Sequence, residues 1–273
     1  HYRFPDICVI GGGVAGLSAT KSGLEEGKKV LLIDENPKLG GSALHSISLV
    51  ENCENINLNG LKEKDAIQTL INEILDHPNL EVMINTSVFG IYEDNLIAAF
   101  CDADLYKIRA ESVILSTGAT DRHLVFENND LPGILTGRGV EKLILCHAVL
   151  PGENAVVVTT HDGGYHSALL LHGAGANVVA VVDGRESGEV GTFEKLIMKL
   201  NIPVYKNITA HKAYGTKKIK RVDVGPIYGQ DSNQSFDCDL LVIAAGFKPQ
   251  LNLLSMGRKR PTWDSERQIL RVS

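Results

Sequence analysis

The residues whose types and spacing most clearly suggest chemistry form a glycine-rich segment, GGGVAG, at residues 11–16. In a turn between a strand and a helix, Gly11 lets the chain change direction sharply. Gly13 has no Cβ, so a pyrophosphate can approach the backbone, and Gly16 lets the helix pack close to the strand. Backbone N–H groups at the helix N-terminus, together with the helix dipole, favour an anion there. The segment therefore predicts a phosphate-binding turn.

The elements around this turn match a dinucleotide-binding βαβ unit. An apolar run, Ile7–Ile10, predicts a strand before the turn, and residues 14–26 have a helical pattern after it. A second apolar run, Val30–Ile33, ends on Asp34, which lies 18 residues past Gly16. A carboxylate at this place accepts hydrogen bonds from the ribose hydroxyls of adenosine. We predict that the unit binds an adenine nucleotide; the alternative is a tight turn without a ligand.

The acid also selects among nucleotides. Two unit charges about 4 Å apart repel each other by roughly 4 kcal/mol at an effective dielectric constant near 20, which is about three powers of ten in affinity. A 2′-phosphate beside Asp34 would meet this repulsion, and the next residues, Glu35-Asn36-Pro37, include no arginine to offset it. NADP is therefore not expected, whereas NAD, FAD and a plain adenine nucleotide remain open.

The composition is that of an ordinary globular protein. The 273 residues suffice for one large domain or two smaller ones, and 44% of them are hydrophobic. With 27 basic and 33 acidic residues the net charge is −6, which disfavours nucleic acid or an anionic membrane as the main partner. No apolar run approaches the roughly 18 residues of a membrane span. The predicted strand begins near Asp6, so we expect no secretory leader and a cytoplasmic protein.

The cysteines and histidines form no recognisable metal or disulfide pattern. The five cysteines are widely spaced and no CxxC occurs, so neither a disulfide framework nor a dithiol redox centre is expected. His161, His166 and His172 are five and six residues apart, which does not place them on one helical face, and we expect no metal site. The cysteines are Cys8, Cys53, Cys101, Cys146 and Cys238.

The chain repeats the same plan further on. Ala155–Thr160 predicts a strand, Tyr165–His172 predicts a helix, and Val178–Val182 predicts a strand that ends on Asp183. The fold class that we predict is α/β, with two nested Rossmann-like three-layer units of the FAD/NAD(P)-binding type.

This repeat also predicts the domain boundaries. Residues 1–120 together with 248–273 would form the first dinucleotide-binding domain, and residues 134–247 would form a second Rossmann-like domain. The turn Leu131-Pro132-Gly133 marks the crossing between them.

Other segments of the first domain also have clear patterns. Apolar positions between Leu61 and Leu75 recur with a helical period. We expect a small antiparallel layer and then a buried strand that ends in Thr117-Gly118. The segments predicted for the layer are Leu80–Ile84, Leu96–Cys101 and Lys107–Ala110, and the buried strand begins at Ser112.

The turn of the second unit lacks the glycine pattern of the first. It reads THDGGYHS, and Thr159 or His161, depending on the alignment, stands where the first glycine would be. Side chains there would crowd a pyrophosphate. We therefore favour a structural role for the second unit over binding of a nicotinamide dinucleotide.

Four stretches together resemble one group of proteins. They are HYRFPDICVIGGGVAGLSA at the start, LLIDENPKLGGS after the first helix, STGATDRHLVFENNDLPGILTGRGVEKLI at residues 116–144, and the late RPTWDSERQIL. The two-unit plan resembles the pyridine nucleotide–disulfide oxidoreductase superfamily. Within it the chain is similar to the α subunits of heterotetrameric sarcosine oxidases, and it also resembles archaeal proline dehydrogenase α and hydrogen cyanide synthase subunits. The likeness covers nearly the whole chain.

The resemblance implies a set of nucleotide-binding residues. In such α subunits the first βαβ unit holds an adenine nucleotide, which is NAD in sarcosine oxidase and ATP in one proline dehydrogenase. Arg122 would contact an anion, although a surface salt bridge is an equal alternative. The residues implied are Gly11, Gly13, Val14, Ala15 and Gly16 for the diphosphate, Asp34 or Glu35 for the ribose, Gly41 and Ser42 beside the phosphates, the backbone of Val88 for the adenine, and Thr117 and Gly118 to close the pocket.

The same resemblance implies partners and further cofactors. In that family FAD oxidises the amine in a separate β subunit, and FMN lies at the interface of α and β. We therefore expect NAD in the first site, with FAD or ATP as alternatives, and FMN at a partner interface. The partner would be a flavin-bearing β-type subunit, and the substrate of the complex would be a small amine.

Three functions remain open. Flavoproteins of this superfamily usually carry a second glycine–acid motif, and none follows Trp263, so FAD would lack half of its usual site. The first hypothesis is an α-like subunit or fragment of a sarcosine- or proline-type amine oxidoreductase. The second is a stand-alone FAD-dependent NAD(P)H oxidoreductase, and the third is a non-enzymatic nucleotide-binding module. No catalytic residue is predicted, since the loop residue His123 is more typical of a solvated histidine.

Overall fold

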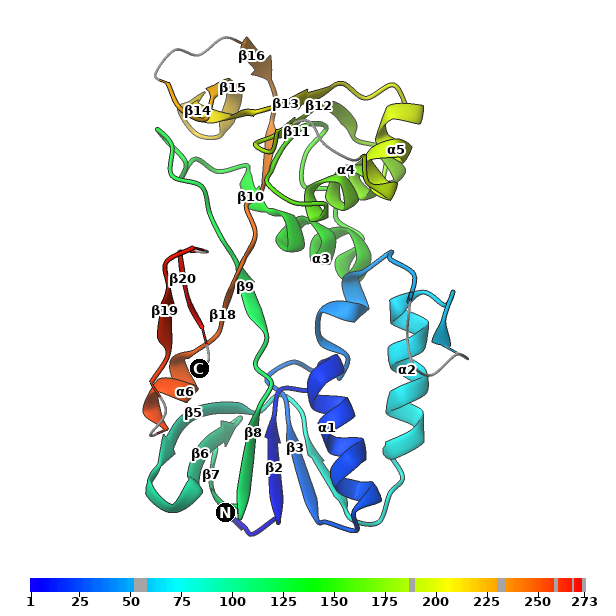
Figure 1. Ribbon diagram of the computed structural model, residues 1–273, viewed down its shortest axis with the longest axis vertical. Coiled ribbons are helices and arrows are strands. Elements are labelled where there is room, and N and C mark those ends of the chain that lie inside the picture. The colour runs from blue at the N-terminus through cyan, green and yellow to red at the C-terminus, as the bar shows by residue number, and fades with distance from the viewer. Residues whose placement is uncertain (52–57, 187–189, 230–233, 258–259, 267, 272–273) are drawn as a thin grey trace. The chain divides into compact units, whose positions relative to one another are not determined.

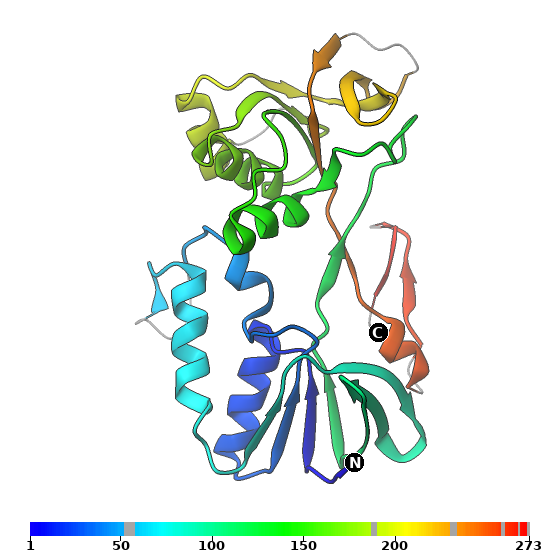
Figure 2. The same ribbon diagram turned by 180° about the vertical axis from the view of Figure 1, so that it is seen from behind.

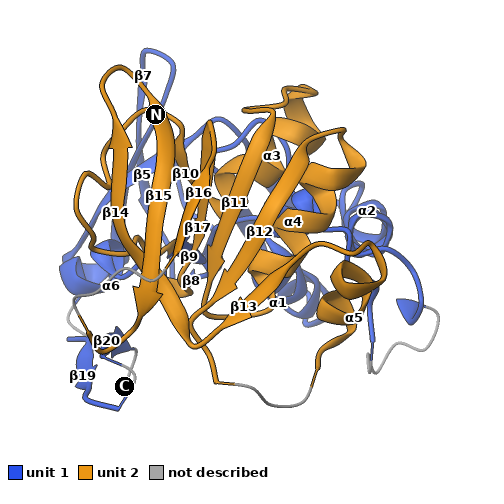
Figure 3. Ribbon diagram, turned by 90° about the horizontal axis from the view of Figure 1, so that it is seen from above, with its two compact units in different colours: residues 1–120, 248–273 blue, residues 121–247 orange. Residues whose placement is uncertain are grey.

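The computed structural model describes residues 1–51, 58–186, 190–229, 234–257, 260–266 and 268–271. By its contacts the chain separates into unit 1, residues 1–120 with 248–273, and unit 2, residues 121–247 (Figure 3). Unit 2 is thus inserted into the sequence of unit 1. It includes residues 131–133, which the sequence analysis leaves between the two domains.

The centre of unit 1 is a four-stranded parallel sheet with the strand order β4-β3-β2-β8 (Figure 1). The central strands are short apolar runs, as parallel strands buried on both faces usually are. Ile10 lies opposite both Ile33 and Leu115, so three adjacent strands end at the same level. The strands are β2 (Ile7–Ile10), β3 (Val30–Ile33), β4 (Leu80–Met83) and β8 (Ser112–Leu115).

Helices and a second sheet cover the two faces of this parallel sheet, as Figure 2 shows from behind. α1 (Val14–Glu25) and α2 (Glu63–Ile74) lie on one face, where Leu32 joins their core. Successive side chains of a strand point to opposite faces. Leu31 therefore packs on the other side, in a core that includes Ile97 of the second sheet.

The second sheet of unit 1 has the order β1-β7-β6-β5, in which β5, β6 and β7 are antiparallel and β1 is parallel to β7. Its strands are β1 (Tyr2–Arg3), β5 (Ser87–Tyr92), β6 (Leu96–Cys101) and β7 (Asp104–Arg109).

The prediction that Leu80–Ile84 belongs to the antiparallel layer is wrong. Leu80–Met83 form β4, which pairs in parallel with β3 and sets Met83 opposite Ile33. α2 supplies the crossover that a parallel connection requires. The sequence places Val88 on this layer but predicts neither β5 nor β1 as a strand; in β5 the pairing with β6 shifts register around Phe89, and Gly90 interrupts the apolar pattern.

Smaller elements complete unit 1, and two short strands pair with each other where the chain passes between the units. No helix in the part of the chain that the structure describes is long and apolar enough to cross a membrane. The smaller elements are η1 (Gly41–His45), η3 (Glu93–Asn95), α6 (Asn252–Met256), β19 (Thr262–Asp264) and β20 (Ile269–Arg271), and the passing strands are β9 (Ala119–Asp121) and β18 (Phe247–Pro249).

Unit 2 has the same three layers around a five-stranded parallel sheet of order β10-β17-β11-β12-β13. In β11, Val157 packs against the helices, whereas Val156 and Val158 pack against an antiparallel sheet. The predicted α/β class with two three-layer units is therefore confirmed. The strands are β10 (Ile134–Thr136), β11 (Asn154–Thr159), β12 (Asn177–Asp183), β13 (Val204–Lys206) and β17 (Leu240–Ala244); the helices are α3 (Gly137–His147), α4 (Gly163–Gly173) and α5 (Thr192–Lys199); the antiparallel strands are β14 (Ile208–Gly215), β15 (Ile219–Pro226) and β16 (Gln234–Asp237).

A buried charge cluster ties α4 to the ends of β12 and β13 in unit 2. Asp183 is fully buried, and its carboxylate accepts hydrogen bonds from the Tyr165 hydroxyl at 2.8 Å, Arg185 at 2.9 Å and Lys206 at 3.0 Å. Burial alone raises the pKa of this carboxyl, but the hydrogen bonds from Arg185, Lys206 and Tyr165 lower it more, and the net pKa lies below its usual range. The ionised form of Asp183 is therefore the one that stabilises unit 2.

This cluster predicts an acid limit to the stability of unit 2. A carboxyl whose pKa is lower in the folded state contributes stability that is present above the unfolded pKa of about 4 and is lost as the pH falls through the folded pKa. We expect Asp183→Asn to lower the free energy of unfolding at pH 7 by about 3 kcal/mol and to flatten its decline below pH 4. Urea unfolding between pH 3 and 7 measures both effects.

Asp162→Asn is the matched control, because the Asp162 carboxylate also pairs with Arg185, at 2.9 Å, but is 58% exposed. We expect this variant to retain the wild-type dependence of stability on pH. Equal acid dependence in the Asp183→Asn variant and the wild type would contradict the assignment.

Candidate functional site

The predicted turn lies where three strands of unit 1 end together. Because Ile10 is in register with Ile33 and Leu115, the residues that follow these strands, Gly11, Asp34 and Ser116, meet at the carboxyl edge of the sheet. In the order β4-β3-β2-β8 the chain connections run in opposite directions from β2, which makes this edge a topological switch point. Ligands of open α/β sheets bind in the crevice at such a point.

Two of the glycines are required by the fold itself. A Cβ on Gly16 would lie only 1.8 Å from the Gly11 carbonyl oxygen and 2.6 Å from Ser116 Oγ. Gly11 has φ +106°, a backbone conformation that favours glycine. The Ser116 hydroxyl donates to the carbonyls of Ile10, at 3.0 Å, and Gly11, at 2.8 Å, and so fixes the turn from the side of β8. The close approach of α1 to β2 therefore depends on Gly11 and Gly16.

Gly13 differs from both, because the protein does not require a glycine there. Its φ of −79° suits any residue, and the nearest atom to an added Cβ is Gly41 Cα at 3.8 Å. Gly13 is the N-cap of α1 and offers no side-chain cap. The first N–H groups of a helix have no intrahelical partner. The space beside Gly13 therefore adjoins backbone donors suited to an anion.

Asp34 is buried and already carries several hydrogen bonds. Its Oδ2 accepts the Gly12 N–H at 2.6 Å, and its Oδ1 accepts the Asn36 N–H at 2.7 Å and the Asn36 side-chain amide at 2.9 Å. A carboxylate has about four acceptor positions. Asp34 thus keeps about one position for a ribose hydroxyl, rather than the pair that the sequence pattern suggests.

A second loop packs against the turn, and the sequence analysis missed part of it. The Gly40 N–H donates to the Gly12 carbonyl at 2.8 Å. A Cβ on Gly12 would lie 2.4 Å from Leu39 Cδ2 and 3.0 Å from Asp34 Oδ2, so a larger residue there would displace the Leu39 side chain. The predicted Gly41 has φ +56°, and a Cβ on it would lie 2.9 Å from Gly13 Cα. The one sequence signal for these contacts is the repetition of glycines in both loops.

The other predicted residues fall into three groups. Val14, Ala15, Glu35, Ser42 and Gly118 are exposed, while Val88 on β5 packs partly against the core. The Thr117 hydroxyl donates to the Gln250 carbonyl at 3.0 Å, and the Gln250 N–H donates to the Gly118 carbonyl at 3.0 Å. Arg122 belongs to unit 2, where its N–H donates to the Gly246 carbonyl. The predicted residues of the first unit thus belong to unit 1, and Arg122 does not.

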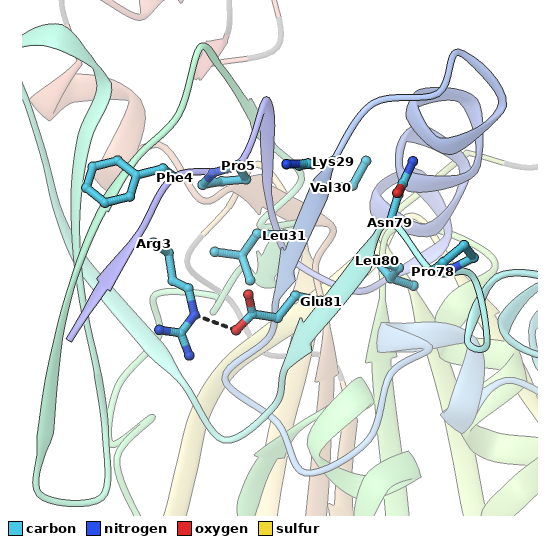
Figure 4. Close-up of a pocket in the computed structure, with 10 residues that line it drawn as sticks. All are labelled: Arg3, Phe4, Pro5, Lys29, Val30, Leu31, Pro78, Asn79, Leu80 and Glu81. Atoms are coloured by element: carbon cyan, nitrogen blue, oxygen red, sulfur yellow. Dashed lines mark hydrogen bonds and ion pairs between the residues drawn. The ribbon is translucent and has the colours of Figure 1, made fainter.

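A pocket of unit 1 lies at the other edge of the parallel sheet (Figure 4). Val30 and Leu80, the first residues of β3 and β4, line it, and Arg3 donates to Glu81 at its side at 2.6 Å. None of the predicted nucleotide-binding residues lines this pocket. It is therefore separate from the candidate site at the carboxyl edge.

The chain belongs to the pyridine nucleotide-disulphide oxidoreductase family, which it matches over residues 5–270. Its relatives include the sarcosine oxidase α subunits of Rhizobium meliloti (strain 1021) and Corynebacterium sp. (strain P-1), each 29% identical. These matches cover 96% and 95% of this chain but 26% and 28% of the relatives. The chain thus spans about a quarter of their length, and its predicted resemblance to sarcosine oxidase α subunits is confirmed.

Solved structures share the fold. The L-proline dehydrogenase from P. horikoshii matches with a TM-score of 0.73 at 21% identity, over 100% of this chain and 48% of its own. The T. acidophilum thioredoxin reductase matches with a TM-score of 0.75 at 19% identity, over 99% of this chain and 90% of its own. At these identities the likeness concerns the fold alone.

The contrast between Gly13 and Gly16 gives a direct test of the site geometry. In nucleotide-free protein we expect Gly16→Ser to lower the free energy of unfolding by about 3 kcal/mol or more, because its side chain overlaps the Gly11 carbonyl. The same change at Gly13 should leave stability within about 0.5 kcal/mol, or raise it, because serine caps helices well. Denaturant unfolding of the two variants measures the difference. Equal destabilisation by both would contradict this geometry.

Proposed function

We propose that unit 1 binds NAD and that the chain is the nucleotide-binding part of an α-like subunit of a sarcosine- or proline-type amine oxidoreductase. The proposal rests on the open space beside Gly13. Packing within the protein does not require a glycine at this position, so the space is available to a ligand. That space adjoins the N-terminus of α1 and lies at the switch point of the sheet. A pyrophosphate is the group that both features suit.

Different residues of unit 1 would contact the pyrophosphate, the ribose and the adenine of the nucleotide. The pyrophosphate lies against Gly13 and the first turn of α1, Val14-Ala15-Gly16, with Gly41 and Ser42 beside it. Asp34 accepts one ribose hydroxyl in its remaining acceptor position. The adenine meets the backbone of Val88, and Thr117-Gly118 closes the pocket. When bound, a nicotinamide dinucleotide can exchange hydride, while the residues of this chain hold and orient it.

We propose that a flavin-bearing β-type partner oxidises the amine, with FMN at the interface of the two chains. The names of the relatives support a partner, because both sarcosine oxidase relatives are named as α subunits of their enzyme. The absence of any CxxC in the sequence speaks against a disulfide reductase that works alone.

The bound nucleotide decides between these functions. We expect heat denaturation of the purified protein to release NAD without flavin, identified by mass spectrometry. Release of FAD would favour the stand-alone NAD(P)H oxidoreductase instead. Release of ATP would keep the site and the proposed complex but contradict the choice of NAD. If the protein releases NAD and no flavin-bearing partner is found with it in its native state, a non-enzymatic module would be favoured.

The buried Asp34 predicts discrimination against a 2′-phosphate. We expect NAD to bind at least about 100-fold more tightly than NADP, in line with charge repulsion of a few kcal/mol. Asp34→Asn should reduce that ratio by about tenfold or more, because it removes the charge while keeping one of the two acceptor oxygens. Calorimetric titration with both nucleotides measures the ratio. Glu35→Gln is the matched control, since Glu35 is exposed, and an equal effect in this variant would assign the discrimination to Glu35.

A further inference from the structure

We infer that the dinucleotide site of unit 2 is filled by the protein's own side chains, with His161 in the place of the pyrophosphate, so that unit 2 takes no pyridine nucleotide. The family name implies such a nucleotide, and unit 2 has the three-layer architecture to hold one. The residues at the carboxyl edge of the unit 2 sheet do not fit a pyridine nucleotide. This inference concerns unit 2 alone and goes beyond the function proposed for unit 1.

The register of unit 2 fixes which residue replaces which glycine. Thr159 at the end of β11 lies opposite Asp183, the acid of this unit. A Cβ on Gly164 would lie 2.3 Å from Thr159 Cβ, just as a Cβ on Gly16 would strike Gly11. Thr159 and Gly164 therefore take the first and third glycine positions of the motif, and His161 takes the second.

The imidazole of His161 covers the N-terminus of α4. Its Nδ1 accepts the Gly163 N–H at 3.0 Å, and a Cβ on Gly163 would lie 2.5 Å from its Cε1. In unit 1, no side chain of the described residues lies within 4 Å of a Cβ added at Gly13, and α1 has no side-chain cap there. The donor that a pyrophosphate would use in unit 2 is thus already paired with a ring that occupies the phosphate's space.

Two further side chains close the crevice between β11 and β17. The His161 ring lies 5.0 Å from the ring of Phe247, which follows β17, the neighbour of β11 in the sheet. The Arg138 guanidinium lies 4.3 Å from the centre of the Phe247 ring. Arg138 is itself held by Asp121, with Nε and Oδ1 2.6 Å apart. His161, Phe247 and Arg138 therefore lie against one another at the switch point of unit 2.

The acid of unit 2 has no acceptor position left for a ribose. The Asp183 carboxylate accepts from the Tyr165 hydroxyl, from Lys206, and from both the backbone and the guanidinium of Arg185. These donors exceed the roughly four acceptor positions of a carboxylate. Within the described residues of unit 1, by contrast, Asp34 accepts from Gly12 and Asn36 alone. Protein groups therefore occupy the places in unit 2 where a pyrophosphate and a ribose would bind, as well as the crevice between β11 and β17.

The test counts nucleotides on the full chain after bound nucleotide has been removed. NADH and NADPH are titrated separately into the wild type and into Gly13→Asp, which adds a favourable helix cap but places a negative charge where the unit 1 pyrophosphate would lie. We expect at most one NADH per chain in the wild type and none in Gly13→Asp at 1 mM ligand. Ser18→Asp is the matched control, because it adds the same charge at an exposed position of α1 and should retain binding.

The outcomes separate the two proposals. Two nucleotides per wild-type chain, or stoichiometric binding that survives in Gly13→Asp, would overturn the inference about unit 2. If no variant binds a nucleotide, the inference about unit 2 would be supported, but the function proposed for unit 1 would be contradicted.

A second variant tests the assignment of His161. In the Gly13→Asp background, His161→Gly with Asp162→Gly removes the imidazole and a carboxylate that pairs with Arg185 at 2.9 Å. We expect inorganic pyrophosphate, the probe here, to bind at least tenfold more tightly than to the Gly13→Asp parent. A folded variant without this gain, as judged by its circular dichroism, would show that His161 is not the group that fills the site.

Discussion

The contact on which the first unit depends is the approach of α1 to the end of β2. With hydrogen in place of a side chain at Gly16, the helix reaches the Gly11 carbonyl; a Cβ would lie 1.8 Å from that oxygen. The approach brings the helix N-terminus over the edge where β2, β3 and β8 end in register. Asp34 and Ser116 then stand on either side of the turn, and their hydrogen bonds hold it. The candidate site is the geometric consequence of this packing.

The two units have the same architecture but differ at the position where a pyrophosphate would lie. Both have helices on one face of a parallel sheet and a second sheet on the other. They differ at the second glycine position, where Gly13 leaves space and His161 fills it. Because a fold does not by itself imply a function, the evidence for binding lies in such single positions. The layers explain the family likeness, and these positions explain why the units need not share a ligand.

The sequence predicted the βαβ unit from Ile7 to Asp34 closely, because short apolar strands and a glycine turn are local patterns. It did not predict the sheet to which Leu80–Met83 belongs, since a four-residue strand with three apolar side chains carries no information about its pairing partner. Helices α3 and α5 were not predicted either. The roles of Gly12 and Ser116 depend on hydrogen bonds to the Asp34 carboxylate and the Ile10 carbonyl, which are distant in sequence, so only the folded chain reveals them.

The hydrogen bonds of Asp34 also determine how the site would choose its nucleotide. With three donors on its two oxygens, the carboxylate can add about one bond to a ribose, worth roughly 1.5–3 kcal/mol for a charged acceptor. The repulsion of a 2′-phosphate at close range is of similar size or larger. In the proposed site, Asp34 would therefore act more by excluding the phosphorylated ribose than by attracting the free one. Attraction for the proposed nucleotide would then come chiefly from the helix N-terminus beside Gly13.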